Sequence, residues 1–290
     1  MKILLKTELK KALKNKAFLA SVIISILLTI LSLIFCVSIY NRDMRDMELI
    51  RGMDNYSANP DISIYSLFNH WIGGESMSLG SSVYFFIFPI LCAMPYGWSY
   101  CVERKSGYTR TMVVLAGKKK YFAVKYIATF VSGGLAVVIP FIINIAMTAC
   151  FFPAIKPEIE NDIYYAVFKN GLMSELFYSK PFLYLFFYLI IDFVFCGLLA
   201  DISLAAASFI KQKYVTVMIP FVVCLLIHLS TKFIYDAAGN YSREISPFYY
   251  LRATDTRLPA SFAVIGVTAF IIFVVTFVIT NIWERKHEIY

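Results

Sequence analysis

Residues 17–40, AFLASVIISILLTILSLIFCVSIY, form an apolar run without a single charged side chain. A helix needs about 20 such residues to cross the roughly 30 Å hydrocarbon layer of a bilayer. The run is too long for the apolar part of a cleavable signal peptide, and no small-residue cleavage site follows it. This stretch therefore predicts a membrane-spanning helix, and it sets the class of the whole chain.

The composition agrees with this interpretation. The chain is 59% hydrophobic and only 16% charged, whereas soluble domains carry about 25% charged residues. We predict an all-α membrane protein that forms one domain over residues 1–290, with six spans at about 17–40, 81–101, 122–152, 181–210, 214–235 and 259–282. The six cysteines lie in or beside apolar runs and the three histidines are far apart, so we expect no disulfide framework and no metal site.

Basic residues gather in alternate connections. Residues 1–16, residues 102–125, the connection after the fourth span and the tail together carry 17 basic and four acidic residues. The other connections, 41–80, 153–180 and 232–258, carry ten basic and 13 acidic residues. Because Lys and Arg concentrate on the cytoplasmic side of membrane proteins, both termini are expected in the cytoplasm. The net charge of +8 then reflects topology, and no nucleic-acid partner is expected.

Residues 2–16 have the pattern of an interfacial helix. One arc carries Leu5, Leu9, Ala12 and Leu13, and the arcs beside and opposite it carry Lys6, Lys10, Lys11 and Lys14. Such a helix lies in the headgroup plane, so membrane lipid is an expected partner. A basic tail without this structure is the alternative.

No motif for catalysis is visible. Gly117-Lys118-Lys119-Lys120 lacks the glycine spacing and the hydroxyl of a phosphate-binding P-loop, so the chain is not expected to hold ATP. No nucleophile–base arrangement and no metalloprotease motif stands out. We therefore expect neither an enzyme nor a bound cofactor.

Two carboxylates lie inside the fourth predicted span, and His228 lies in the fifth. Ionisable groups at that depth are costly and often mark a transport pathway. Asp192 and Asp201 are nine residues apart, about 180° around a helix, so one helix cannot direct both to one site. Asp192 either packs against Asn144, a Ser or a Tyr of a neighbouring helix, or takes part in substrate or proton movement.

The connection between the second and third spans is unusually apolar at its centre. If residues 106–116 are helical, one 100° arc holds the side chains of Tyr108, Met112, Leu115 and Ala116. Val113 and Val114 flank Arg110 on the other side, Gly117 suits the position after the helix end, and three lysines follow. Two apolar faces indicate insertion into a groove of a partner protein. The alternative is a cytoplasmic extension of the neighbouring spans.

At these residues the chain resembles the permease subunits of ABC-2-type transporters. Members have an N-terminal elbow helix, six spans and, after the second span, a coupling helix that a Glu opens, followed by a basic turn and a Lys that begins the third span. Here Glu103, Gly107-Tyr108-Thr109, Lys118–Lys120 and Lys125 match. The resemblance places the coupling helix at about 103–117 and implies that the ATPase-coupling residues are Glu103, Arg104, Gly107, Tyr108, Arg110, Met112, Leu115 and Lys118.

The resemblance extends over nearly the whole chain. Ser246-Pro247 with Phe248 and Tyr249 matches a partly re-entrant hairpin before the last span, and 283–286 match a basic tail. The chain lacks the large outward domain of the mechanotransmission-type relatives.

The resemblance implies an exporter subunit in the plasma membrane of a bacterium, paired with a second permease copy. A separate ABC ATPase would hold ATP and Mg²⁺, and the substrate would be amphipathic, such as an antimicrobial peptide or a drug. The alternatives are a proton-coupled secondary transporter that uses Asp192 and Asp201, or a membrane scaffold or sensor that does not transport.

Overall fold

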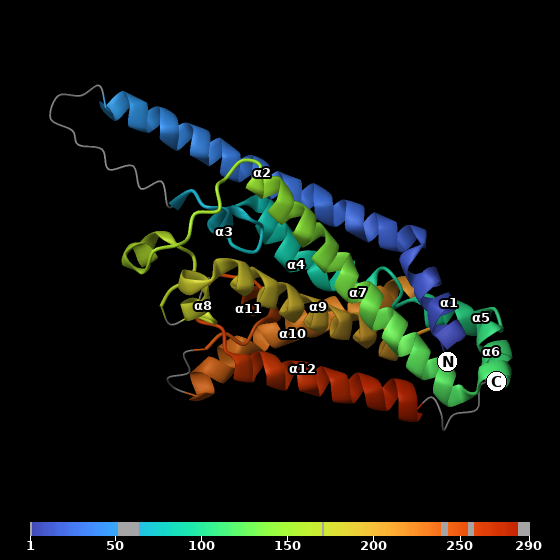
Figure 1. The fold of residues 1–290 in the computed structure, drawn as a ribbon. Coiled ribbons are helices and arrows are strands. Elements are labelled where there is room, and N and C mark those ends of the chain that lie inside the picture. The colour runs from blue at the N-terminus through green and yellow to red at the C-terminus, as the bar shows by residue number, and fades with distance from the viewer. Residues whose placement is uncertain (1, 52–63, 170, 239–242, 255–257, 284–290) are drawn as a thin grey trace.

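The computed structural model describes residues 2–51, 64–169, 171–238, 243–254 and 258–283. All regular elements in these residues are helical, which confirms the all-α prediction. Figure 1 shows the long helices side by side, with α1, α5 and α6 at one end of the bundle and α3 and α8 at the other. The basic tail at 284–286 lies outside the described residues.

Five of the described helices are long and apolar enough to cross a membrane. They correspond to five of the six predicted spans, with ends that differ by several residues: α2 Lys16–Arg51, α7 Lys118–Ala149, α9 Pro181–Ala206, α10 Lys213–Ala238 and α12 Phe262–Phe277, which continues as the π-helix η3 Val278–Trp283. The architecture is typical of an integral membrane protein.

The second predicted span is interrupted. Helix α4, Leu79–Ala93, has 15 residues, too few to cross the hydrocarbon layer alone, and a turn separates it from α5, Ser99–Lys105. Pro95 explains the break, because its nitrogen carries no hydrogen for the carbonyl of Leu91. The hydroxyl of Ser21 in α2 donates to that carbonyl instead, at 2.6 Å. The segment predicted as a span over 81–101 therefore consists of two helices, α4 and α5, separated by a turn at 94–98.

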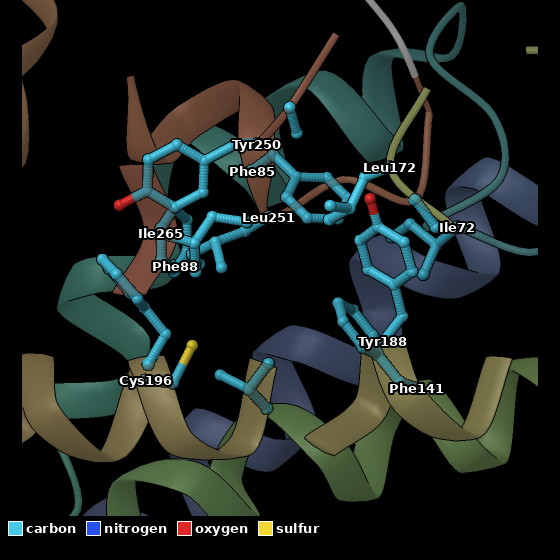
Figure 2. Close-up of a cluster of buried hydrophobic side chains, with 14 of the residues drawn as sticks. Ile72, Phe85, Phe88, Phe141, Leu172, Tyr188, Cys196, Tyr250, Leu251 and Ile265 are labelled. Atoms are coloured by element: carbon cyan, nitrogen blue, oxygen red, sulfur yellow. The ribbon is translucent and has the colours of Figure 1, made fainter. Parts of the chain in front are cut away.

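Helix α9 is the centre of the bundle. It packs against α4, α7, α10 and α12. At its closest approach to α7, a Cβ on Gly133 would lie 2.4 Å from the Cβ of Ala200, so only glycine fits there. Figure 2 shows Tyr188 and Cys196 of this helix on one side of the aromatic core, with Phe85 and Tyr250 across from them.

Short segments cover the end of the bundle that was predicted to face outward. They comprise α3 Leu67–His70, the 3-10 helix η2 Ile159–Tyr164, α8 Ser174–Ser179 and α11 Pro247–Tyr250. In the structure Trp71 and Ile72 are buried, and the amide of Ile72 donates to the side chain of Asn144 at 2.8 Å. Residues 66–75 thus contribute to the core.

The opposite end carries α1, Lys2–Leu13, and α6, Tyr108–Ala116. Helix α1 packs against the first half of α7, near Tyr96 and Ala128. The same part of α7 meets the end of α12, where the hydroxyl of Tyr126 pairs with that of Thr276 at 2.9 Å. The first and last described helices therefore meet α7 at the same end of the bundle.

Candidate functional site

A buried lysine lies at the centre of a charged cluster at this end of the bundle. Lys125 of α7 is fully buried, and its Nζ lies 2.8 Å from a carboxylate oxygen of Glu103 and 3.2 Å from one of Glu8. It also donates to the hydroxyl of Tyr96 at 3.1 Å. We call the following residues the Lys125 cluster: Glu8, Lys11, Tyr96, Glu103, Tyr108, Tyr121 and Lys125. They come from α1, α5, α6, α7 and the turn after α4.

The remaining bonds of the Lys125 cluster join its helices in pairs. Tyr96 donates to Glu8 at 2.6 Å, and Tyr121 donates to Glu103 at 2.6 Å. Lys11 donates to Glu8 at 3.0 Å and to the hydroxyl of Tyr108 at 2.6 Å. Each carboxylate therefore accepts from a lysine and a tyrosine, so the buried charges are hydrogen-bonded as well as paired.

The electrostatics of α1 depend on these contacts. Burial alone would raise the pKa of Glu8, but the Lys125 ammonium and hydrogen bonds from Tyr96 and Lys11 outweigh burial and lower that pKa. Partial burial would lower the pKa of Lys11, but its bonds to Tyr108 and Glu8 raise it. Both groups are therefore held in their charged forms.

Sequence reasoning found part of the Lys125 cluster. Glu103, Tyr108 and Lys125 were singled out, and the structure brings them together with residues that were missed, namely Glu8, Lys11, Tyr96 and Tyr121 as cluster members. One signal for Glu8 was present, since it is the single acid among the six lysines of residues 1–16. It lies on the same buried face as Ala12, which had been assigned to the apolar arc.

Residues 103–117 form two helices. Glu103 and Arg104 lie in α5, which ends at Lys105, and Gly107 has a φ of 76° before α6 begins. This left-handed backbone suits glycine and stops a continuous helix. Arg104 donates to the carbonyl of Ser208 at 2.8 Å, which ties α5 to the segment after α9.

Helix α6 has an inner and an outer face. Thr109 is buried beside Tyr121, and Met112 and Val113 pack against an aromatic group around Tyr100. On the outer face Val114 is 85% exposed and Leu115 is 75% exposed. Two apolar faces were expected, with Met112 and Leu115 on one arc. In the structure Met112 packs inward with Val113, whereas Leu115 is exposed with Val114.

Arg110 and Lys118, which the resemblance also predicts as coupling residues, lie beside this outer face. Arg110 is exposed in α6, and Lys118 is the first residue of α7. Gly117 between the helices has a φ of 81°, so α6 is bounded by glycines with left-handed φ values on both sides. The segment is a short helix between two sharp turns.

The polar groups predicted inside the spans lie in separate places. Asn144 accepts from the amide of Ile72 and donates to the carbonyl of Thr29, so it is not the partner of Asp192. Asp192 lies near Tyr84 of α4 and Asp201 near Tyr126 of α7. One oxygen of Asp192 has no hydrogen-bond partner among the described residues, whereas the carboxyl of Asp201 faces the hydroxyl of Tyr126. Both aspartates are buried, because α9 is surrounded on opposite faces.

The predicted hairpin before the last span contains the short helix α11. Pro247 is its first residue and Phe248 is buried, while Tyr249 is half-buried. The Nδ1 of His228 in α10 lies 3.0 Å from the hydroxyl of Ser246, and its ring meets Phe248 and Tyr249. These residues form part of the aromatic wall at the predicted outward end.

Comparison with known protein families, curated proteins and solved structures finds no match for this chain. The arrangement of the described residues is therefore the basis for a functional assignment.

Proposed function

We propose that this chain is the membrane-spanning permease subunit of an ATP-driven exporter of the ABC-2 type, in a bacterial plasma membrane. In this proposal α4 and α5 together supply a sixth crossing, and both termini lie in the cytoplasm. A separate ABC ATPase docks on α6 and holds ATP and Mg²⁺, and a second permease copy completes the pathway. The substrate is an amphipathic molecule such as an antimicrobial peptide or a drug.

The observation that carries this proposal is the two-sided engagement of α6. Its inner face is bonded to the bundle, whereas its outer face presents Val114 and Leu115 to solvent beside Arg110. A short helix with exposed apolar residues and adjacent basic residues has the features of a segment that docks in a groove of another protein.

The contacts of α6 supply a route by which partner movement would reach the bundle. Tyr108 is bonded to Lys11 of α1, and Thr109 lies 3.4 Å from the hydroxyl of Tyr121 in α7. Through Glu103 these helices share the Lys125 cluster. Separating them would leave buried charges without partners, which is costly. A displaced α6 is therefore expected to move α1 and α7 with it.

The test is co-purification of ATP hydrolysis with the full chain from native membranes in mild detergent. Val114→Ser with Leu115→Ser should abolish the associated hydrolysis and leave the permease folded, because both side chains are exposed. Leu49→Ser is the matched control, since Leu49 is 70% exposed on the far end of α2. Equal hydrolysis with both variants, or transport by the purified chain without any ATPase, would refute the proposal.

A proton-coupled secondary transporter is the second candidate, and the buried, incompletely bonded carboxyls of Asp192 and Asp201 favour it. It requires uptake or efflux in proteoliposomes driven by a pH gradient alone. Asp192→Asn should abolish that flux, and Asp46→Asn, at an exposed aspartate of α2, should not.

A further inference from the structure

A second buried cation lies at the other end of the bundle, and it forms no ion pair with the residues that the structure describes. Arg252 follows α11 and is 8% exposed. Its Nε has no hydrogen-bond partner, and its guanidinium forms no ion pair with the described residues. The guanidinium carbon lies 4.8 Å from the centre of the Phe85 ring. An arginine side chain stays charged in proteins, so a permanent cation is buried here against an aromatic face.

The nearby carboxylate of Glu75 is occupied by its own loop. One oxygen accepts from the hydroxyls of Ser32 and Ser78, and the other accepts from the amides of Met77 and Ser78 at 3.0 and 2.9 Å. Glu75 influences Arg252 electrostatically but makes no ion pair with it. Arg252 therefore keeps its capacity to bind an anion.

Arg252 lines a pocket of about 560 Å³ between α4, α10 and α11. The wall combines aromatic rings with polar groups, and its members include Met77, Ser82, Phe86, His228 and Phe248. A guanidinium can donate two parallel hydrogen bonds to a phosphate. The pocket thus offers a cation for a phosphate and aromatic surface for an apolar group.

The rim of the pocket is apolar and exposed. Met77 is 83% exposed and Phe86 is 49% exposed. Helix α10 presents further apolar residues on a face next to the one that carries His228, namely Val222, Leu226 and Leu229, which are 42%, 61% and 57% exposed. Because α10 is long and apolar enough to cross a membrane, this surface is suited to contact acyl chains. A ligand with its anionic group on Arg252 would lay its apolar part along this surface.

We propose that this pocket binds an anionic phospholipid, with the phosphate on Arg252 and an acyl chain along Phe86 and the exposed face of α10. A zwitterionic lipid fits less well, because its phosphate already carries its own cation. The inference uses no contact of α6, so it stands or falls independently of the proposed ATPase partner.

The experiment is a lipid titration of the full, delipidated chain in detergent, followed by native mass spectrometry. Phosphatidylglycerol should bind more tightly than phosphatidylcholine, and Arg252→Met should weaken phosphatidylglycerol binding by about tenfold or more. Arg243→Met is the matched control, because Arg243 is an exposed arginine at the same end, and it should bind as the unchanged chain does.

A second variant and a competition experiment test the same assignment. Phe86→Ser removes a half-exposed side chain, so it should weaken lipid binding without unfolding, even if Arg252→Met fails to fold. Free glycerol 3-phosphate should compete poorly. Equal binding by the two arginine variants, equal binding of both lipids, or competition by glycerol phosphate at the same concentration as the lipid would overturn the assignment.

Discussion

Lys125 and Arg252 are buried cations near opposite ends of one helical bundle, and their surroundings differ. Lys125 has carboxylates of two other helices within 3.2 Å. Arg252 has an aromatic ring at 4.8 Å and no ion pair among the described residues. A compensated buried charge joins helices, whereas an uncompensated one destabilises the protein until an anion arrives. Lys125 therefore holds helices together, whereas Arg252 is a candidate anion-binding residue.

The largest loss of stability is expected when the paired cation Lys125 is removed. Lys125→Met leaves Glu8 buried with only Lys11 as a cationic partner. It should lower the free energy of unfolding by about 3 kcal/mol or more, since removing one member of a buried pair strands the other charge. The measurement is reversible unfolding in mixed micelles. Lys119→Met, at an exposed lysine of the same helix, should change it by less than about 0.5 kcal/mol. Equal effects would contradict the comparison.

A smaller effect is expected from pH at the same end. Because the folded-state pKa of Glu8 is below its ordinary value of 4.5, its contribution to stability is complete above that value and is lost as the pH falls through the lower folded-state pKa. Lys125 would then keep Glu103, so the loss should be less than in Lys125→Met. Unfolding free energies of the unchanged chain and of Glu8→Gln should differ by a constant amount above pH 4.5 and converge as the pH falls below that value. A difference that stays constant below it would contradict this assignment.

Removing the uncompensated charge of Arg252 should change the free energy of unfolding in the opposite direction to Lys125→Met. Arg252→Met removes a buried charge that has no ion pair, so in lipid-free detergent it should raise the free energy of unfolding by on the order of 1 kcal/mol. The lost contact with Phe85 keeps the gain small. Adding phosphatidylglycerol should stabilise only the unchanged chain and reduce the difference. Destabilisation of the variant in lipid-free detergent would place Arg252 with Lys125 as a structural residue.

The smallest stability effect is expected on the outer face of α6. Leu115→Ser should alter the free energy of unfolding by less than about 0.5 kcal/mol, because the side chain is 75% exposed. Met112→Ser, on the inner face of the same helix, should lower it more. A similar loss for both would show that the outer face is packed against the bundle.

Local pattern predicted the long helices well and failed where a tertiary contact decides the backbone. The apolar runs became helices because their hydrogen bonds are internal to each segment. The break after Ala93 depends on Pro95 together with Ser21, which lies on another helix. The sequence did not show which face of α6 turns inward, because a short helix with apolar residues all round has no pattern that fixes its rotation. That rotation depends on contacts such as Thr109 with Tyr121.

The sequence by itself determined the helical class, the apolar spans and the concentration of basic residues in alternate connections, because each is a property of neighbouring residues. Only the tertiary structure decided how charges are matched. Glu8 and Lys125 are 117 positions apart and pair closely. Arg252 is buried without an ion pair among the described residues, and the nearby Glu75 accepts from Ser32, Met77 and Ser78 instead. Pairing over such distances depends on how helices pack, which a local pattern does not encode.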